Sequence, residues 1–150
     1  MPVLINQKQY LPDFIRLNEN WIAHYFRIEE ADRELARNPA RIIADGGYIF
    51  TLLEEDQAVG VCALFKEDDD VFQLARMAVH PAFQDKGYGH ALIDAAFAKL
   101  REIKASRVYL LSNTILVPAL ALYKKRGFSV LSEGAHPVYA RCNIVMEKML

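Results

Sequence analysis

The sequence predicts an α+β fold, in which a mixed, mostly antiparallel sheet is flanked by helices. Between residues 12 and 38, apolar side chains recur every three or four positions, which is typical of helices that pack on one face. Residues 48–79 hold three strand-like segments separated by short polar turns, which predicts an antiparallel meander. A helix, a strand, a second helix and two strands follow, so a crossover connection adds a parallel pair to the sheet.

Length and composition are those of an ordinary globular protein. The 150 residues favour one domain spanning 1–150, with 53% hydrophobic and 25% charged residues. The net charge of −1 gives no electrostatic reason to expect nucleic acid or an anionic membrane as a partner. No secretory signal is visible and no apolar run reaches the ~20 residues of a membrane span, so we expect a cytoplasmic protein. Cys62 and Cys142 lie in separate strand-like segments, which favours reduced core thiols over a disulfide or a metal pair.

The N-terminal elements are one short strand and two helices. Residues 3–5 form the predicted strand, and Pro12 begins the first helix. The apolar face of that helix comprises Phe14, Leu17, Trp21, Ile22 and Tyr25. The second helix is predicted from Glu29 to Asn38, because acidic residues in its first turn suit the helix dipole and Pro39 stops it.

The meander follows a turn at residues 45–47. Its strands are predicted at residues 48–54, 58–65 and 71–79, where aromatic and β-branched residues are frequent. The charged loop at 66–70 is interpreted as a solvated hairpin tip rather than a cation site, because no spaced ligand pattern follows it.

The C-terminal half is predicted to begin with a long helix from Tyr88 to Lys104 and a strand at 107–111 parallel to residues 71–79. A further helix is predicted from Pro118 to Arg126, with Gly127 as its C-terminal cap. The last two strands are predicted near residues 128–131 and 140–149.

The most informative segment joins the third strand of the meander to the long helix. It reads Q-x-x-G-x-G from Gln84 to Gly89, and such a loop turns several backbone N–H groups toward one point at the positive end of a helix dipole. Glycine is expected at 87 and 89 because a Cβ would block close approach of a phosphate or forbid the φ required. A Rossmann fingerprint is excluded by Leu92 and a P-loop by His90. The segment is therefore either a pyrophosphate site or a tight loop that only caps the helix.

This loop resembles the acyl-CoA-binding motif of the GCN5-related N-acetyltransferases, the GNAT superfamily. A second segment, residues 119–128, resembles the part of GNAT proteins in which a helix tyrosine, here Tyr123, precedes a Gly-Phe pair by four residues. The order of elements also matches, so the resemblance spans the whole chain. It implies a GNAT-like acyl-CoA N-acyltransferase fold, acetyl-CoA as co-substrate and no metal.

The resemblance also implies where the cofactor binds. The backbone from Asp85 to His90 would hold the pyrophosphate, the strand end at 77–79 would pair with the pantetheine arm where the sheet splays, and Asn113 would bind that arm or simply cap a strand. Many GNAT proteins have asparagine seven residues before the tyrosine, where this chain has Leu116. The expected cofactor-binding residues are Met77, Ala78, Val79, Gln84, Asp85, Lys86, Gly87, Tyr88, Gly89, His90 and Asn113.

The resemblance further implies that Tyr123 is the general acid that returns a proton to the departing CoA thiolate. The alternative is an ordinary core tyrosine. The general base is unassigned, because Gln73 stands where some relatives have a glutamate and the strand at 107–111 contains no acid. Three acids and one histidine are candidates for the general base. The acids Glu29, Glu30 and Glu54 are interpreted as surface charges, and His80 is interpreted as a turn residue.

Substrate recognition is expected from the first two helices, the hairpin and the final strands. Aromatic residues there either line an acceptor pocket or belong to the core, namely Trp21, Tyr25, Phe26 and Tyr48. Arg76 lies on a sheet strand and needs a partner, for which we expect an internal acid in preference to a substrate carboxylate.

These features predict an enzyme that moves acetyl from acetyl-CoA to a primary amine of a small molecule or peptide by direct attack. No nucleophile motif for a covalent intermediate is present. Two alternatives are a non-catalytic acyl-CoA-binding module and a protein N-terminal acetyltransferase, the latter disfavoured by the acid-free strand at 107–111. The resemblance also makes a homodimer through the late strands plausible.

Overall fold

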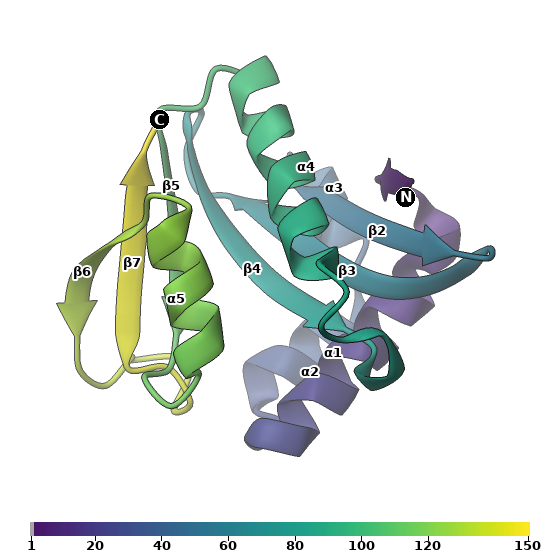
Figure 1. The fold of residues 1–150 in the computed structure, drawn as a ribbon, viewed down its shortest axis with the longest axis horizontal. Helices are drawn as coiled ribbons and strands as arrows, with labels where there is room; N and C mark the ends of the chain where they lie inside the picture. Colours follow the sequence, from purple (N-terminus) through teal and green to yellow (C-terminus); the bar gives the residue numbers. More distant parts are fainter. Residues whose placement is uncertain (1) are drawn as a thin grey trace.

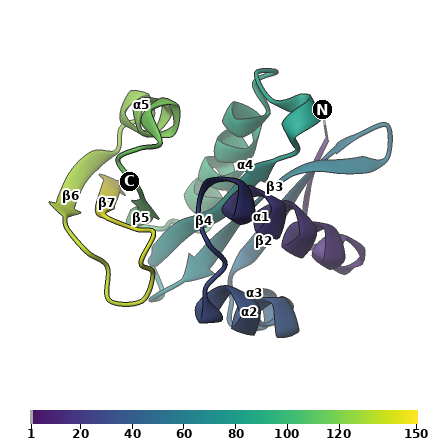
Figure 2. The same ribbon diagram turned by 90° about the horizontal axis from the view of Figure 1, so that it is seen from below.

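The computed structural model describes residues 2–150 and contains one seven-stranded sheet with helices on both faces (Figures 1 and 2). The strands are β1 (Val3–Ile5), β2 (Tyr48–Glu54), β3 (Gln57–Lys66), β4 (Val71–Val79), β5 (Arg107–Ser112), β6 (Ser129–Glu133) and β7 (Ile144–Met149). The α-helices are α1 (Leu11–Tyr25), α2 (Glu30–Arg37), α3 (Arg41–Ala44), α4 (Tyr88–Glu102) and α5 (Val117–Lys125), and short 3₁₀ turns cover Lys8–Tyr10 and Pro81–Phe83.

The sheet is mixed and mostly antiparallel, as predicted. Its order is β1-β2-β3-β4-β5-β7-β6, and only β4 and β5 run parallel. The helix α4 makes the crossover between these two strands, which explains the parallel pair. The parallel ladder is short, because it joins only residues 71–73 to residues 107–109. Beyond these three pairs the two halves of the sheet diverge, as Figure 1 shows for β4 and β5.

Helices cover the two faces of the sheet unequally. In Figure 2, α4 and α5 lie on one side, and α1, α2 and α3 on the other. Alternate residues of β2 and β3 therefore point into two different cores, which explains why both strands are apolar almost throughout. The core under α4 contains Phe50, Leu52, Val59, Leu64, Leu92, Ile93 and Leu100. The core under α1 and α3 contains Phe14, Leu17, Ile42, Ile49, Val61 and Ala63.

Three elements differ from the sequence predictions. The long helix ends at Glu102 rather than at Lys104, because Lys104 has a left-handed φ of +58°. The short helix α3 was not predicted. Residues 140–143 do not extend the last strand, because the N–H of Cys142 donates back to the carbonyl of Tyr139 and closes a turn. Cys142 is therefore a loop residue and not a strand residue, although it is buried and free like Cys62.

No helix within residues 2–150 is long and apolar enough to cross a membrane.

Candidate functional site

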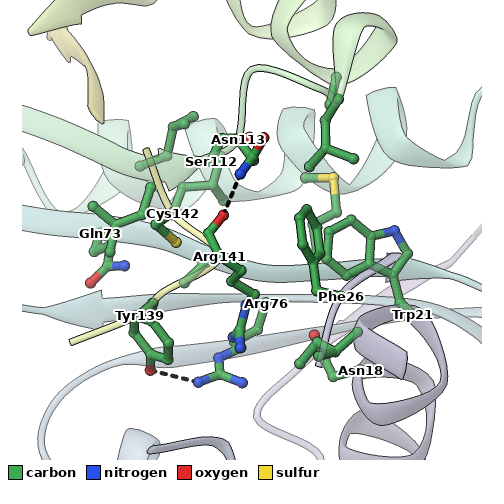
Figure 3. Close-up of a pocket in the computed structure, with 18 of the residues that line it drawn as sticks. Asn18, Trp21, Phe26, Gln73, Arg76, Ser112, Asn113, Tyr139, Arg141 and Cys142 are labelled. Carbon is green, nitrogen blue, oxygen red and sulfur yellow. Dashed lines mark hydrogen bonds between the residues drawn. The ribbon is translucent and has the colours of Figure 1, made fainter. Parts of the chain in front are cut away.

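A cleft opens where β4 and β5 diverge (Figure 3). Residues 73–77 of β4 form one wall and residues 110–113 the other. The helices α1 and α5 and the loop before β7 close it. Figure 3 shows Trp21 and Phe26 on one side of the cleft and Gln73 and Cys142 on the other. The cleft encloses about 840 Å³ when the space open to solvent is counted.

The β4 wall of the cleft contains a β-bulge. Val61 of β3 pairs with Ala78, and Ala63 pairs with Ala75, so Arg76 and Met77 lie opposite a single residue of β3. Arg76 has a left-handed φ of +57°, which is unusual for a residue with a long side chain. A bulge interrupts the ladder and leaves the extra residue unpaired. The backbone at Arg76 and Met77 is therefore available to a ligand in the cleft.

The loop before α4 has the geometry of an anion site. Gly87 is the N-cap of the helix and has φ +79°, and Asp85 also has a positive φ, of +63°. The requirement for glycine at 87 is thus conformational. No side chain caps α4, so the N–H groups of Tyr88, Gly89 and His90 lack intrahelical acceptors at the positive end of a 15-residue helix.

Glycine at 89 has a different explanation. An added Cβ would meet only Leu122 at 3.9 Å and Met77 at 4.0 Å, which are ordinary contacts. Packing within the protein therefore does not require glycine there. Close approach of a phosphate to the backbone at this residue stays a prediction.

Contacts from other elements hold this loop in place. The hydroxyl of Tyr88 donates to the carboxylate of Glu54, and the Tyr88 ring stacks on Phe83 with centroids 6.5 Å apart. The hydrogen bond to Glu54, followed by burial and the Glu54 charge, raises the pKa of Tyr88 to about 12. Glu54 is thus engaged in a structural contact rather than facing the cleft. Lys86 packs over the Phe83 ring, with Nζ 5.2 Å from its centroid.

Tyr123 lies at the α5 end of the cleft. Its ring contacts Phe128 edge-on, with centroids 6.0 Å apart. Burial raises the pKa of Tyr123 to about 12. Within residues 2–150 its hydroxyl makes no hydrogen bond, and no buried side-chain polar atom of these residues is unpaired, so the hydroxyl is accessible from the cleft.

Asn113 lies at the opposite wall, but its amide group is already used. It donates to the carbonyl of Arg141 at 2.7 Å and accepts from the N–H of Ile115 at 3.0 Å. The strand-end cap is thus the role that its contacts show. A bond to the pantetheine arm stays a prediction and could use the second amide hydrogen or the second lone pair of Oδ1.

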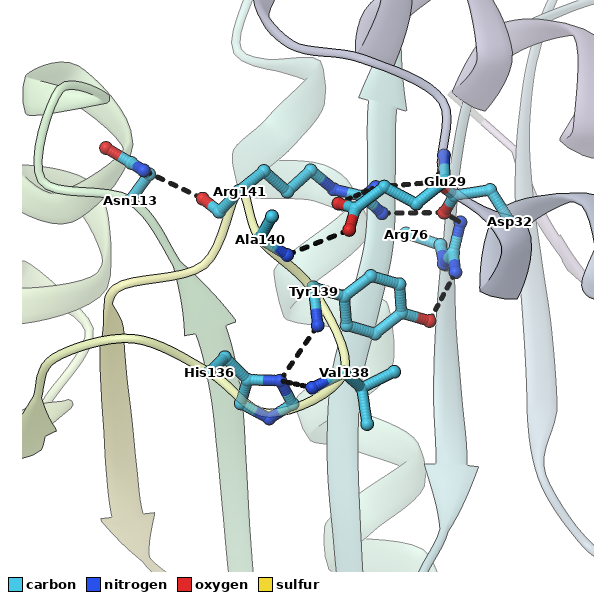
Figure 4. A network of polar contacts seen from close by, with 9 residues as sticks. All are labelled: Glu29, Asp32, Arg76, Asn113, His136, Val138, Tyr139, Ala140 and Arg141. Carbon is cyan, nitrogen blue, oxygen red and sulfur yellow. Dashed lines mark hydrogen bonds and ion pairs between the residues drawn. The ribbon is translucent and has the colours of Figure 1, made fainter.

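Arg76 has an internal acid as its partner, as expected. Its Nη1 lies 2.5 Å from Oδ1 of Asp32, and Arg141 donates to both oxygens of the same carboxylate, at 2.6 and 2.7 Å. Figure 4 shows the two arginines converging on Asp32 from different segments. The hydroxyl of Tyr139 accepts from Nη2 of Arg76 at 2.7 Å. We call Asp32, Arg76, Tyr139 and Arg141 the arginine cluster.

Glu29 joins the arginine cluster to α2. Its carboxylate accepts from the N–H of Ala140 at 2.8 Å and from Arg141 at 3.2 Å, and it forms a capping box with Asp32. Burial alone would raise the pKa of Asp32, but the hydrogen bonds from Arg141 and from the Glu29 N–H, with the charges of both arginines, hold it below its usual value. Sequence reasoning missed Asp32, Tyr139 and Arg141. The spacing of Glu29 and Asp32 is the signal that could have revealed the capping box.

The other candidates lie away from the cleft or in structural roles. Glu30 is exposed and pairs with Arg37 on the surface of α2. Nδ1 of His80 accepts from the N–H of Ala82 at 3.1 Å, which is a turn role. Tyr25 is exposed, and Tyr48 packs on Phe72 outside the cleft.

No carboxylate or imidazole lines the cleft among the residues that the structure describes. Its ionisable lining residues are Arg76, Tyr123, Tyr139, Arg141 and Cys142. Within residues 2–150 there is also no group of three or more His, Cys, Asp or Glu side chains that could hold a metal ion.

Sequence comparison matches residues 15–128 to the acetyltransferase (GNAT) family. The chain is 27% identical to the uncharacterized N-acetyltransferase YvbK of Bacillus subtilis over 103 residues, 66% of each protein. It is 34% identical to the amino-acid acetyltransferase of Neisseria meningitidis over 90 residues, 59% of this chain. The chain spans about two thirds of the first relative but only 20% of the second.

Structure comparison gives the same fold over the whole chain. A GNAT family acetyltransferase from Staphylococcus aureus superposes with a TM-score of 0.86 at 18% identity and covers 99% of both chains. The PaiA N-acetyltransferase from Thermoplasma acidophilum, solved in complex with coenzyme A, gives 0.76 at 18% identity and covers 100% of both.

Proposed function

Since this chain belongs to the GNAT family of acetyltransferases, we propose that it transfers acetyl from acetyl-CoA to a primary amine of a small-molecule or peptide acceptor. The observation that carries the proposal is the cleft between β4 and β5. It joins an interrupted backbone at Arg76 and Met77 to an accessible hydroxyl at Tyr123. The N-terminus of α4 provides an anion site of the kind that pyrophosphate needs.

The cofactor would lie along β4 and reach the loop before α4. The free N–H groups from Asp85 to His90 would bind its pyrophosphate, and the backbone of Met77, Ala78 and Val79 would pair with the pantetheine arm. The Gln84 and Lys86 side chains are exposed beside this path. An N–H group freed by the bulge would bind the thioester oxygen, where negative charge develops during attack.

The transfer would proceed by direct attack, without a covalent enzyme intermediate. The free amine forms a C–N bond to the acetyl carbon, and the C–S bond breaks. The hydroxyl of Tyr123 gives its proton to the departing sulfur and recovers one from solvent, while the acceptor nitrogen loses its extra proton to water. A phenol suits this step because burial keeps Tyr123 protonated.

The proposal is tested first by calorimetric titration with acetyl-CoA and then by release of free thiol with a panel of amines. We expect micromolar binding and acceptor-dependent thiol release. Absence of binding, both alone and with amine present, would contradict a cofactor role for the loop at residues 84–89.

A second function is supported by one observation, the lack of a carboxylate or imidazole along the cleft within residues 2–150. A non-catalytic acyl-CoA-binding module needs no base, and it would bind acetyl-CoA without releasing thiol with any amine. A protein N-terminal acetyltransferase is a third function, and faster turnover of peptides than of small amines would identify it.

A further inference from the structure

Two arginines form part of the cleft wall, and their N–H donors without a partner among residues 2–150 indicate the class of acceptor. This inference rests on the acetyltransferase activity proposed above. The side chains of Arg76 and Arg141 are only 8% and 11% exposed, and Asp32 between them is 1% exposed. The carboxylate therefore lies behind the guanidinium groups, away from the cleft that both arginines line.

The protein uses only part of the hydrogen-bonding capacity of these groups. Arg76 donates through Nη1 to Asp32 and through Nη2 to Tyr139, and Arg141 donates through Nη1 and Nη2 to Asp32 and Glu29. Neither Nε has a partner among residues 2–150. Because no buried side-chain nitrogen or oxygen of these residues is unpaired, both Nε atoms are accessible. Arg141 and Arg76 both border this cleft, and Arg76 also borders a hollow beside α2.

The two guanidinium groups are also held rigidly. The ring of Tyr139 lies against both, with its centroid 4.6 Å from the Arg141 carbon Cζ and 5.4 Å from that of Arg76. A donor that is already fixed loses little rotamer entropy when it binds a ligand. Both guanidinium groups are paired with carboxylates, Asp32 with each of them and Glu29 with Arg141, so what they offer a ligand in the cleft is the N–H of each Nε.

We propose that the acceptor carries a carboxylate close to its amine, and that Arg141 and Arg76 bind this carboxylate. Arg76 belongs to the bulge next to which the acetyl group would lie. Because Arg76 provides both the bulge backbone and one of the two guanidinium groups, the carboxylate and the attacking nitrogen would lie no further apart than its side chain can reach, a separation that an amino acid spans. Trp21 and Phe26 line the cleft beside this position and leave room for an apolar side chain.

The test compares matched acceptors in the thiol-release assay. Glycine, L-alanine, L-methionine, L-phenylalanine, β-alanine and 4-aminobutyrate are each paired with the corresponding carboxamide, which keeps the amine and removes the charge. We expect kcat/KM to be about 10- to 100-fold higher for the preferred carboxylate than for its amide, the effect of one or two charge-assisted hydrogen bonds. Rates are compared at equal concentrations of free amine, because the amides have less basic nitrogens. Aminomethylphosphonate replaces glycine in one arm, to distinguish a carboxylate site from a general anion site.

Two variants locate the effect. Arg141→Lys keeps the charge but loses the planar set of donors, so it should raise KM for the carboxylate about tenfold or more. Turnover of the matched amide should fall much less than turnover of the carboxylate, because the amide carries no charge for Arg141 to bind. Arg107→Lys is the control, since Arg107 forms a similar ion pair with Glu147 at 2.7 Å but does not line the cleft.

The outcomes separate this inference from the proposed function. Equal turnover of acids and amides, or turnover confined to amines without a carboxylate, overturns the carboxylate site and leaves the transferase standing. If the protein binds acetyl-CoA but acetylates none of the amino acids or carboxamides, the carboxylate site is also overturned. Failure to bind acetyl-CoA overturns the proposed function itself.

Discussion

The hydroxyl of Tyr88, the first residue of α4, donates a hydrogen bond to the carboxylate of Glu54, the last residue of β2. This contact fixes the start of the helix whose free N–H groups would form the proposed anion site. Glu54→Ala should therefore destabilise the fold in urea unfolding, because Tyr88 loses its acceptor, and should weaken acetyl-CoA binding in calorimetry. Glu54→Gln retains an acceptor and should recover most of both losses. Equal acetyl-CoA affinity in the parent, Glu54→Ala and Glu54→Gln proteins would show that the Tyr88–Glu54 hydrogen bond does not support the anion site.

The same pair predicts an alkaline transition. The pKa of Tyr88 is raised to about 12, above its unfolded value of about 10. The resulting stability is complete below pH 10 and is lost as the pH rises through the folded pKa. In Glu54→Gln the phenol loses its charged acceptor, so Tyr88 should ionise at lower pH. Tyrosinate absorbance followed from pH 9 upward measures this shift, and superimposable titrations would contradict it.

Tyr123→Phe tests the general acid. The substitution removes the hydroxyl but keeps the contact with Phe128, so kcat should fall about 10²- to 10⁴-fold, while acetyl-CoA affinity stays nearly constant. Tyr25→Phe is the control, because Tyr25 is an exposed tyrosine outside the cleft. Comparable losses of rate and of affinity would assign Tyr123 to binding or packing.

The pH profile provides a second test of Tyr123. With its pKa raised to about 12, the phenol keeps its proton at pH values where an ordinary tyrosine, with a pKa of about 10, would ionise. In the parent protein kcat should therefore not decline near pH 10 through loss of this acid. A decline at pH 10 that is absent from Tyr123→Phe would show that the pKa is not raised.

Gly89→Ala separates helix stability from ligand binding. Alanine favours a helix over glycine by up to about 1 kcal/mol, and its Cβ would meet only ordinary contacts here. The variant should thus be at least as stable as the parent in urea unfolding. It should nevertheless bind acetyl-CoA about 10- to 100-fold less tightly, because the methyl group keeps a phosphate from one or two N–H donors. Unchanged affinity would show that the phosphates do not approach this residue.

Asp32→Asn should be strongly destabilising. It leaves two buried arginines with a weaker partner, and breaking a buried ion pair costs about 3–5 kcal/mol. Asp13→Asn is the control, because Asp13 pairs with Arg16 on the exposed surface of α1 and should cost less than about 1 kcal/mol. Urea unfolding at neutral pH measures both. If Asp32→Asn lowered the free energy of unfolding as little as Asp13→Asn does, the arginine cluster would contribute little to stability.

Unfolding at acidic pH tests whether ionised Asp32 stabilises the folded protein. Because the folded pKa of Asp32 lies below its unfolded value of 3.8, its stabilisation is present above that value and is lost as the pH falls through the folded pKa. The Asp32→Asn variant lacks this term. Its stability should therefore fall less steeply than that of the parent below about pH 4. Parallel slopes in unfolding curves taken at several acidic pH values would contradict the lowered pKa.

Local patterns were sufficient to predict most of the fold. The strands at 48–54 and 71–79 were predicted with the bounds that the structure has, because period, turn residues and β-branched side chains agree there. The turn at residues 139–142 was missed, because an apolar stretch with one arginine looks like the start of a strand. It depends instead on Glu29, which accepts from the N–H of Ala140 across more than a hundred residues of sequence.

The candidate site was predictable only where it is local in sequence. The loop at 84–89 and the segment around Tyr123 are contiguous, and their residues do lie on one side of the sheet with α4 and α5. The arginine cluster brings together α2, β4 and the loop before β7, and nothing in the sequence alone couples Asp32 to Arg141. The bulge at Arg76 was equally hidden, since no glycine marks its positive φ.

The position of β7 has a consequence for how the chain folds during synthesis. The strands β1 to β4 are all neighbours in the sheet, and the hairpins between β2 and β4 join segments close in sequence. These strands can pair soon after they leave the ribosome. β7, however, lies between β5 and β6, so β6 has no neighbouring strand to pair with until residues 144–149 have emerged. A nascent chain would therefore have its first four strands in place, and β5 able to pair with β4, while β6 still lacks its partner.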